Sequence, residues 1–298
     1  MMAVTIETII CMTNPMPAPA TQPIFCTKAT GYRGIWHGQT PTHDEYVYKY
    51  SGGLGTYPHQ SRPFALYRPE VNKTFFCWGG TVENFVPTNQ QYGANQLLHM
   101  VSYFDHTTGQ VPRPTILFDK YCGDAHDNPV ITIDDAGYIW IFSPSHGQWT
   151  TPSFVHRSRE PYSIDRFETV TVWLYAYPQI WHVPSGFTLM HTQYDNGRKL
   201  RCTTSADGIT WTTPVRLAEI EQGHYQVTAQ RDDKLVTAFN YHPAVGGLEA
   251  RTNLYFMQST DNGVTWTTAA GEILDLPLTT IENDALIRNY RAEGLLVY

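Results

Sequence analysis

The sequence has little charge and no long apolar run. Only 16% of its 298 residues are Asp, Glu, Lys or Arg, against about 25% in an ordinary globular domain. Because disordered chains are rich in charge and poor in aromatic residues, this low charge, together with 13% aromatic residues, excludes a disordered chain. No stretch reaches the roughly 18 apolar residues of a membrane-spanning helix, so no such helix is predicted.

Basic clusters and cysteine pairs are missing as well. No run of Lys and Arg exceeds two residues and the formal net charge is −7, which argues against a nucleic-acid surface, since phosphate binding needs clustered cations. The five cysteines are scattered without a CxxC pair, so neither a disulfide framework nor a zinc finger is predicted. The N-terminus lacks a basic segment and contains Glu7, so it does not have the pattern of a signal peptide.

What the chain does contain is typical of an all-β protein. It has 22 Gly and 20 Pro, and from about Gly31 short aromatic or β-branched runs alternate with turn residues, as in a sandwich, barrel or propeller. Residues 1–28 are predicted to be a tail or linker. They contain closely spaced prolines, which block both helices and central strands. Residues 29–298 are predicted to form one β-propeller domain, incomplete at its C-terminal end.

Two near-copies of one short motif favour the propeller. Ser205–Trp211 and Ser259–Trp266 both read S-x-D-(x)-G-x-T-W, and their tryptophans lie 55 residues apart. In this pattern Ser and Asp hydrogen-bond the turn backbone, Gly allows a positive φ, and Trp packs between sheets. The motif resembles the Asp box of the bacterial-neuraminidase repeat (BNR), a hairpin between the outer strands of propeller blades. It carries no information on catalysis.

A longer repeat predicts the blades themselves. Each copy is a strand that opens on a polar or aromatic residue, then a turn, then a strand that ends in His, Tyr or Trp. The openings are His59, His126, Tyr177, His224 and, for an incomplete fifth copy, Asn283, spaced by 47 to 67 residues. This is the length of a four-stranded blade. Four blades and half of a fifth are therefore expected, with the opening and closing residues at one mouth of the axial channel.

The predicted mouth is rich in histidine and tyrosine. Its residues are His59, His126, His146, His191, His224, His242, Tyr177, Tyr194 and Tyr241. His and Tyr serve as general acids and bases, and Arg198 is suited to pair with a carboxylate. Such a set fits β-elimination on a uronic acid: Arg neutralises the uronate, one His or Tyr removes the C5 proton, and another protonates the departing O4.

Other readings stay open at this point. Asp124, Asp127 and Glu249 are carboxylates of the kind that a glycoside hydrolase needs in a facing pair. Several neutral histidines could hold zinc, although no HxH or HExxH spacing occurs. A structural zinc or calcium ion and a non-catalytic carbohydrate-binding propeller also remain. A sialidase-like hydrolase needs three arginines and a Tyr/Glu pair, which the sequence does not place at the mouth.

The segment 46–57 has the composition of a sugar-binding lip. Tyrosines such as Tyr57 can stack on pyranose faces, and the glycines that precede it allow close approach, while Lys49 adds a cation. The alternative is a flexible loop that leads into a strand. Arg33–Trp36, and His242 with Arg251, are weaker candidates of the same kind.

Eight ordered motifs carry a family resemblance over about residues 31–298. The chain resembles the BNR propellers that include the ulvan lyases. The motifs span residues 31–36, 49–55, 124–129, 142–147, 177–179, 191–194, 223–226 and 239–243. The resemblance implies a seven-bladed propeller and endolytic β-elimination of ulvan, a sulfated algal polysaccharide. Family members continue past the strand that ends at Tyr298, so some site residues are expected outside this chain.

The resemblance also implies roles for single residues. It implies His126 as base, His146 as acid–base partner or substrate ligand, Tyr177 (alternatively Tyr194) as acid or base, and Arg198 as the group that neutralises the uronate. Substrate contacts are expected from Lys49, Tyr57, His59, Gln60, Asn128, Gln179, His191, His224, Tyr241, His242 and Arg251. The expected partner is a polysaccharide, with no nucleic acid, no membrane and no cofactor required for catalysis. A polymeric substrate implies a secreted or periplasmic protein.

Overall fold

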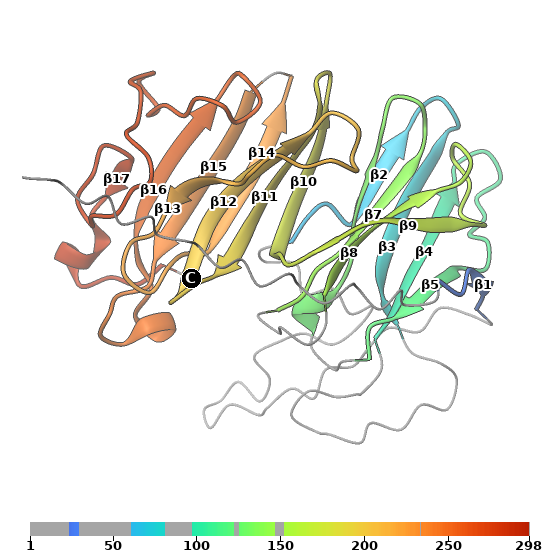
Figure 1. The fold of residues 1–298 in the computed structure, drawn as a ribbon, viewed down its shortest axis with the longest axis horizontal. Helices are drawn as coiled ribbons and strands as arrows, with labels where there is room; N and C mark the ends of the chain where they lie inside the picture. Colours follow the sequence, from blue (N-terminus) through green and yellow to red (C-terminus); the bar gives the residue numbers. More distant parts are fainter. Residues whose placement is uncertain are drawn as a thin grey trace, which may run out of the picture.

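The computed structural model describes residues 24–29, 61–80, 97–121, 125–146, 152–232 and 234–297. Within these ranges the protein is all-β, with four antiparallel sheets and three short 3-10 helices (Figure 1). The helices are η1 (Ala125–Asp127), η2 (Gly247–Ala250) and η3 (Tyr290–Glu293). No helix of the described residues has the length and apolarity needed to cross a membrane.

The four sheets follow one another along the chain. The first has the order β1-β5-β4-β3-β2, with β1 at Thr27–Lys28, β2 at Ala65–Arg68, β3 at Lys73–Gly80, β4 at Leu98–Asp105 and β5 at Thr115–Asp119. The second runs β6 (Val130–Ile133), β7 (Ile139–Ser143), β8 (Ser153–Ser158) and β9 (Phe167–Trp173). The third runs β10 (Ala176–Val183), β11 (Gly186–Tyr194), β12 (Arg198–Ser205) and β13 (Val215–Ala218). The fourth runs β14 (Gln226–Arg231), β15 (Lys234–Tyr241), β16 (Thr252–Ser259) and β17 (Leu286–Arg288).

Successive sheets pack face to face, which explains their sequence patterns. One apolar core lies between the first and second sheets, another between the second and third, and a third between the third and fourth. The strands β6 and β7 are buried on both faces and read as continuous apolar runs. The strand β14 instead alternates from its start, with Val227 exposed and Thr228 buried, because one face of this sheet is open. This arrangement confirms the predicted all-β, propeller-type fold.

The predicted half of a fifth blade is wrong. The segment that begins at Asn283 leads into β17, which pairs with β16 as the outer strand of the fourth sheet. The long connection after Ser259 contains the second Asp box and makes only isolated bridges, through Thr267 and Leu278. Because this connection is long, the fourth strand lies as far along the sequence as the first strand of a new blade would.

Both Asp boxes adopt the predicted hairpin between the third and fourth strands of a sheet. In the first, Asp207 Oδ1 accepts the Thr210 backbone N–H at 2.7 Å, and the Trp211 indole N–H donates to the Gly208 carbonyl at 3.1 Å. The second box repeats these bonds with Asp261 and its own Gly and Trp. The two tryptophans pack into successive inter-sheet cores. The Asp boxes therefore hold the outer rims of the third and fourth sheets against the preceding sheet.

The glycine of the second box gives a stability prediction. Gly263 has φ +82°, and a Cβ there would lie 2.7 Å from Cys202 Sγ in the core, whereas Gly271 has φ +92° with no atom within 4 Å of such a Cβ. Both Gly→Ala substitutions place a side chain at positive φ, but only Gly263→Ala also overpacks a core. We expect Gly263→Ala to lower the free energy of unfolding by about 1–3 kcal/mol more than Gly271→Ala. Urea unfolding of the two variants measures the difference, and equal losses would contradict the packing at Cys202.

A short segment before β2 joins three sheets near their inner strands. The Arg62 N–H donates to the Pro178 carbonyl in β10 at 2.9 Å, and the Pro63 carbonyl accepts the N–H of Ile131 in β6 at 2.9 Å. The Arg62 guanidinium reaches further and donates to the Thr228 carbonyl in β14 at 3.3 Å. The inner strands of the second, third and fourth sheets therefore converge on residues 62–63.

Candidate functional site

The five predicted catalytic residues lie at one edge of the sheets. His126 is in η1 just before β6, and His146 follows β7. Tyr177 is near the start of β10, Tyr194 is the last residue of β11, and Arg198 is the first residue of β12. In antiparallel sheets the start of one strand and the end of the next share an edge. This edge is at the bottom of Figure 1, where the orange coil of η2 follows β15.

The two histidines form a stacked pair. The ring centroids of His126 and His146 are 3.9 Å apart, with an angle of 17° between the ring planes. Tyr177 stands edge-on to both rings, at 5.8 and 5.4 Å. Both residues are partly exposed, whereas Tyr177 beneath the pair is buried.

Tyr177 connects this pair to the rest of the site. Its hydroxyl lies 2.7 Å from His146 Nε2 and accepts the Tyr194 hydroxyl at 3.2 Å. Its backbone has φ +49°, an uncommon conformation for a residue other than glycine, and its side chain is 1% exposed. Burial raises the pKa of Tyr177 well above its usual value of 10, so the side chain keeps its proton across the neutral range.

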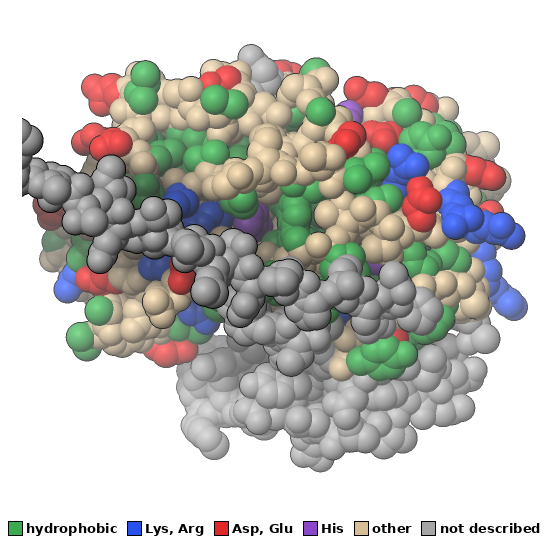
Figure 2. All heavy atoms as spheres, in the orientation of Figure 1, with side chains coloured by type: hydrophobic (Ala, Val, Ile, Leu, Met, Phe, Trp, Pro, Cys, Tyr) green, Lys and Arg blue, Asp and Glu red, His purple; other side chains and the backbone are tan. Residues whose placement is uncertain are grey.

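Two arginines lie among the tyrosine rings of this edge. The guanidinium carbon of Arg198 is 5.5 Å from the ring centres of both Tyr194 and Tyr225, and that of Arg251 is 5.5 Å from the ring of Tyr225. The Arg198 Nε is buried without a hydrogen-bond partner. On the broad face that Figure 2 draws, basic, acidic and apolar side chains are interspersed. Two guanidinium groups around one tyrosine ring attract an anion such as a carboxylate.

Tyr225 is a site residue that the sequence reasoning missed. Its ring contacts Tyr177 at 5.5 Å and His242 at 4.8 Å between centroids, besides the two arginines. The only signal was its place beside His224 in the motif of residues 223–226. Neighbours in an extended chain point to opposite sides, and here the tyrosine, not the histidine, points into the cluster.

His242 belongs to the same cluster, as predicted. It is fully buried behind Tyr225, and neither ring nitrogen has a hydrogen-bond partner. Burial, followed by the charge of Arg198, lowers its pKa to about 3. His242 is therefore neutral at physiological pH, with polar atoms left free beside the two arginines.

His224 and His191, by contrast, are core histidines. The His224 Nδ1 bonds the Asn240 carbonyl at 2.9 Å and its Nε2 accepts the Ile220 N–H at 3.0 Å. Both ring nitrogens are thus used inside the protein. His191 is 3% exposed and lies between sheets, 6.4 Å from the Trp173 ring. The structure does not bring either ring into the cluster, because each side chain points between sheets.

Three further predicted contacts also lie inside the protein. The Gln179 amide donates to the Gln226 carbonyl at 2.8 Å and thereby joins β10 to β14. Tyr241 is buried in the last core, where its hydroxyl accepts Arg291 at 2.8 Å. Asn128 is buried against Gly79.

Several predicted residues are not described. Lys49, Tyr57, His59, Gln60 and Asp124 lie outside the described residues, so their substrate and hydrolase roles remain predictions. Among the residues that are described, no group of three or more His, Cys, Asp or Glu is placed to hold a metal ion. The alternative of a structural zinc or calcium ion therefore stays untested.

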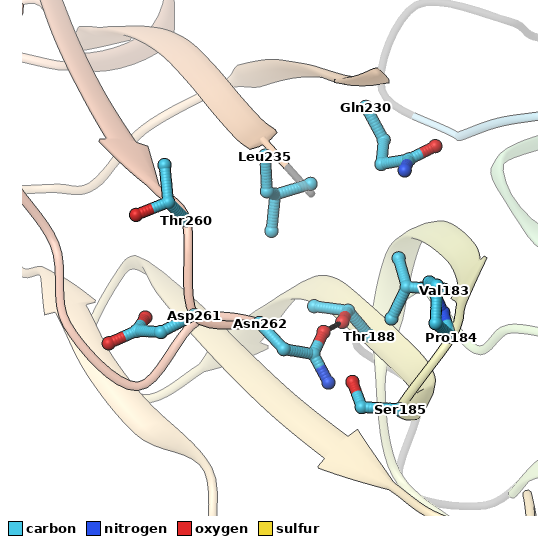
Figure 3. A pocket seen from close by; sticks show the side chains of 9 residues that line it. All are labelled: Val183, Pro184, Ser185, Thr188, Gln230, Leu235, Thr260, Asp261 and Asn262. Carbon is cyan, nitrogen blue, oxygen red and sulfur yellow. Dashed lines mark hydrogen bonds between the residues drawn. The ribbon is translucent and has the colours of Figure 1, made fainter. Parts of the chain in front are cut away.

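A well-formed cavity lies at the opposite edge of the sheets. It has a volume of about 340 Å³ and is bounded by the β10–β11 turn at Pro184, by Leu235 and by the second Asp box at Asn262 (Figure 3). Its one ionisable lining group, Asp261, already caps the Asp-box turn. Its lining residues therefore offer no acid–base pair of the kind found in the histidine and tyrosine cluster.

Comparison with known proteins identifies the family of the chain. Residues 74–296 match the BNR repeat-containing family. A curated relative, an ulvan lyase of Nonlabens ulvanivorans, is 26% identical over 190 residues, which are 52% of this chain and 40% of the relative. The chain thus spans less than half the length of that relative.

Solved structures show the same fold. An ulvan lyase of polysaccharide lyase family PL25 superposes with a TM-score of 0.65 at 20% identity, over 80% of this chain and 60% of its own. The same kind of enzyme, bound to a -[GlcA(1-4)Rha3S]- unit, gives a TM-score of 0.66 at 19% identity, over 87% and 62%. The polysaccharide lyase Uly1 gives 0.61 at 14% identity, over 90% and 68%.

Proposed function

Because the chain belongs to the BNR repeat-containing family, we propose that it is a polysaccharide lyase that cleaves a uronate-containing polymer by β-elimination. The observation that carries the proposal is the 2.7 Å contact between the Tyr177 hydroxyl and His146 Nε2, beside the guanidinium of Arg198. This places acid–base groups next to a cation that can hold a carboxylate.

The reaction needs a base, an acid and a cation from the protein. A base removes the proton from C5 of the uronate, the electron pair forms the C4=C5 bond, and the C4–O4 bond breaks as O4 takes a proton. The C5 proton is only weakly acidic until the carboxylate charge is neutralised. Preorganised cations at that carboxylate therefore stabilise the transition state more than the ground state.

The cluster offers a residue for each need. Arg198, supported by Arg251, holds the carboxylate. His126, partly exposed on the stacked pair, takes the C5 proton. The hydrogen-bonded pair of His146 and Tyr177 supplies the proton for O4. Because burial keeps Tyr177 in its phenol form, that proton is present at neutral pH. Exchange with water then restores both groups.

The substrate class is proposed from the charge of the site and from the relatives. Two arginines around one tyrosine suit a polymer with an anionic group on neighbouring sugars, such as a sulfated, ulvan-like polysaccharide. One solved relative holds a unit of this type, GlcA(1-4)Rha3S. A polysaccharide is met outside the cytoplasm, so we propose a secreted or periplasmic location. We also propose that the elimination itself needs no cofactor.

The test follows the product. Incubation of the protein with ulvan, glucuronan and pectin should raise the ultraviolet absorbance of a 4,5-unsaturated uronate on at least one of them. No rise on any uronate polymer would exclude the lyase. Binding to ulvan without product would identify a non-catalytic carbohydrate-binding propeller instead.

The role of Arg198 gives a separate prediction. We expect Arg198→Gln to lower kcat/KM on the active polymer by about 10²- to 10³-fold, the usual effect of removing one charge-stabilising donor. The matched control is Arg231→Gln, since Arg231 is an exposed guanidinium at the other end of β14. Steady-state kinetics should show wild-type values for the control. A similar loss in both variants would mean that overall charge, not the position of Arg198, supports turnover.

A further inference from the structure

A buried carboxylate joins the segments that carry the stacked imidazoles. Asp127 follows His126 in η1 and is 1% exposed. Its Oδ1 accepts the backbone N–H of His146 at 2.5 Å. A helix of three residues has too few internal hydrogen bonds to hold its own position. Its placement therefore depends on contacts such as this one.

The segment of His146 is anchored separately to two other elements. Ser145 N–H donates to the Tyr175 carbonyl at 3.0 Å, and Ser143 Oγ bonds His99 Nδ1 in β4 at 2.8 Å. These bonds fix residues 143–146 against neighbouring sheets but do not involve η1. The Asp127 bond directly links η1 to this anchored segment.

We propose that Asp127 is a positioning residue that sets His126 and His146 face to face. The kinetic part of this inference rests on the proposed lyase function; the structural part does not. A charged acceptor makes a short and strong hydrogen bond to a backbone N–H. A displacement of about 1 Å between reacting groups costs about 100-fold in rate, so a shift of η1 against the segment of His146 lowers turnover while the arginines still bind substrate.

Three substitutions at this position separate geometry from charge. Asp127→Asn keeps an oxygen acceptor at the same place without the charge. Asp127→Glu keeps the charge but moves it by one methylene, and Asp127→Ala removes the acceptor. We expect kcat to fall by about 10- to 100-fold in the Ala and Glu variants, with KM within about twofold. The Asn variant should recover to within about threefold of the wild type. If Asp127→Ala does not fold, the kcat values of the Asn and Glu variants are sufficient for the test. A role of charge alone predicts a higher kcat for Asp127→Glu than for Asp127→Asn, the opposite of the order expected here.

The imidazole ring protons provide a readout that needs no activity. Stacked rings shift one another's ring C–H resonances in the proton NMR spectrum, and substitution of each histidine assigns the signals. These shifts should persist in Asp127→Asn and move in Asp127→Glu and Asp127→Ala. An inactive wild type would remove the proposed function, yet the spectrum would still decide the position of the rings.

The matched control lies at the other end of the same hairpin. Asp134 is also a capping carboxylate, whose two oxygens accept the Tyr138 N–H at 2.8 Å and the Trp140 indole N–H at 2.9 Å. Asp134→Ala should lower stability but leave kcat and the imidazole shifts unchanged. The inference is overturned if Asp127→Glu keeps wild-type kcat and shifts, or if Asp134→Ala changes them as much as Asp127→Ala does.

Discussion

Tyr177→Phe is expected to lower kcat on a uronate polymer by about 10²- to 10⁴-fold, the range for loss of a positioned acid–base group. The substitution removes only the hydroxyl that lies 2.7 Å from His146 Nε2 and 3.2 Å from the Tyr194 hydroxyl. The ring, its packing and the Cβ at positive φ all stay. The loss should therefore appear in kcat and not in folding, and unsaturated product measured per folded molecule gives the value.

Tyr175→Phe is the matched control for this experiment. Tyr175 lies two residues earlier and is equally buried, but its hydroxyl donates to the Phe154 carbonyl at 2.7 Å and not to the site. Its removal should cost about 1 kcal/mol of stability and leave kcat unchanged. A Tyr177→Phe enzyme that keeps more than a tenth of the wild-type kcat would remove this hydroxyl from the mechanism.

Acid is expected to unfold the protein at about pH 4.5–5.5, because buried histidines gain protons on unfolding. Burial lowers the pKa of His156, His224 and His242 to about 3, that of His191 to about 4, and that of His99 well below its usual 6.5. These side chains are neutral when folded and charged when unfolded below pH 6.5. Unfolding therefore takes up protons, and the stability that is complete above pH 6.5 is lost as the pH falls towards 4.

The size of this effect is large for one domain. Each such histidine contributes a slope of at most about 1.4 kcal/mol per pH unit. Five of them approach about 7 kcal/mol per unit, against a total stability of about 5–15 kcal/mol. Unfolding is then expected near pH 4.5–5.5. Neighbouring cations such as Lys120, beside His99 and His156, add to the cost of protonation.

Urea unfolding between pH 7 and 5.5 measures the proton count directly. The slope of the unfolding free energy against pH should correspond to about four to five protons near pH 5.5. His191→Leu offers an internal check, since neither ring nitrogen of His191 has a hydrogen-bond partner. This variant should lower the slope by about one proton. A wild-type slope of fewer than two protons would mean that these histidines are hydrated in the folded protein.

The fold was readable from the sequence where local chemistry determines local geometry. The Asp boxes were recognised because Asp207 and Asp261 bond backbone groups only a few residues away. The position of β17 could not be predicted, because it depends on the length of the connection between Ser259 and the strand that pairs with β16. Such a long connection leaves no periodic signal.

The site was predicted in part for a similar reason. Position at a strand end follows from the repeat, so His126, His146, Tyr177, Tyr194 and Arg198 were assigned to one edge, where the structure places them. The direction of each side chain at that edge is set by the packing of neighbouring sheets, which no single repeat records.

That limit explains one exchange of residues in particular. The sequence pointed to His224, but its ring is held by the Ile220 and Asn240 backbones, and the adjacent Tyr225 faces the cluster instead. Gln179 was likewise assigned to substrate, yet it bonds the backbone of β14. Both side chains hydrogen-bond buried backbone groups of another part of the chain. Such partners are determined by the packing of the sheets and cannot be predicted from one repeat.

The segment at Arg62 has a consequence for biosynthesis. Its guanidinium bonds the Thr228 carbonyl, 166 residues later in the chain. A ribosome adds about 5–20 residues per second, so Arg62 emerges roughly 10–30 s before this partner exists. Until the fourth sheet is made, the apolar face of the third sheet lacks its neighbour and is open to aggregation. Because of the order of translation, the junction of sheets at residues 62–63 is one of the last parts of this protein to form.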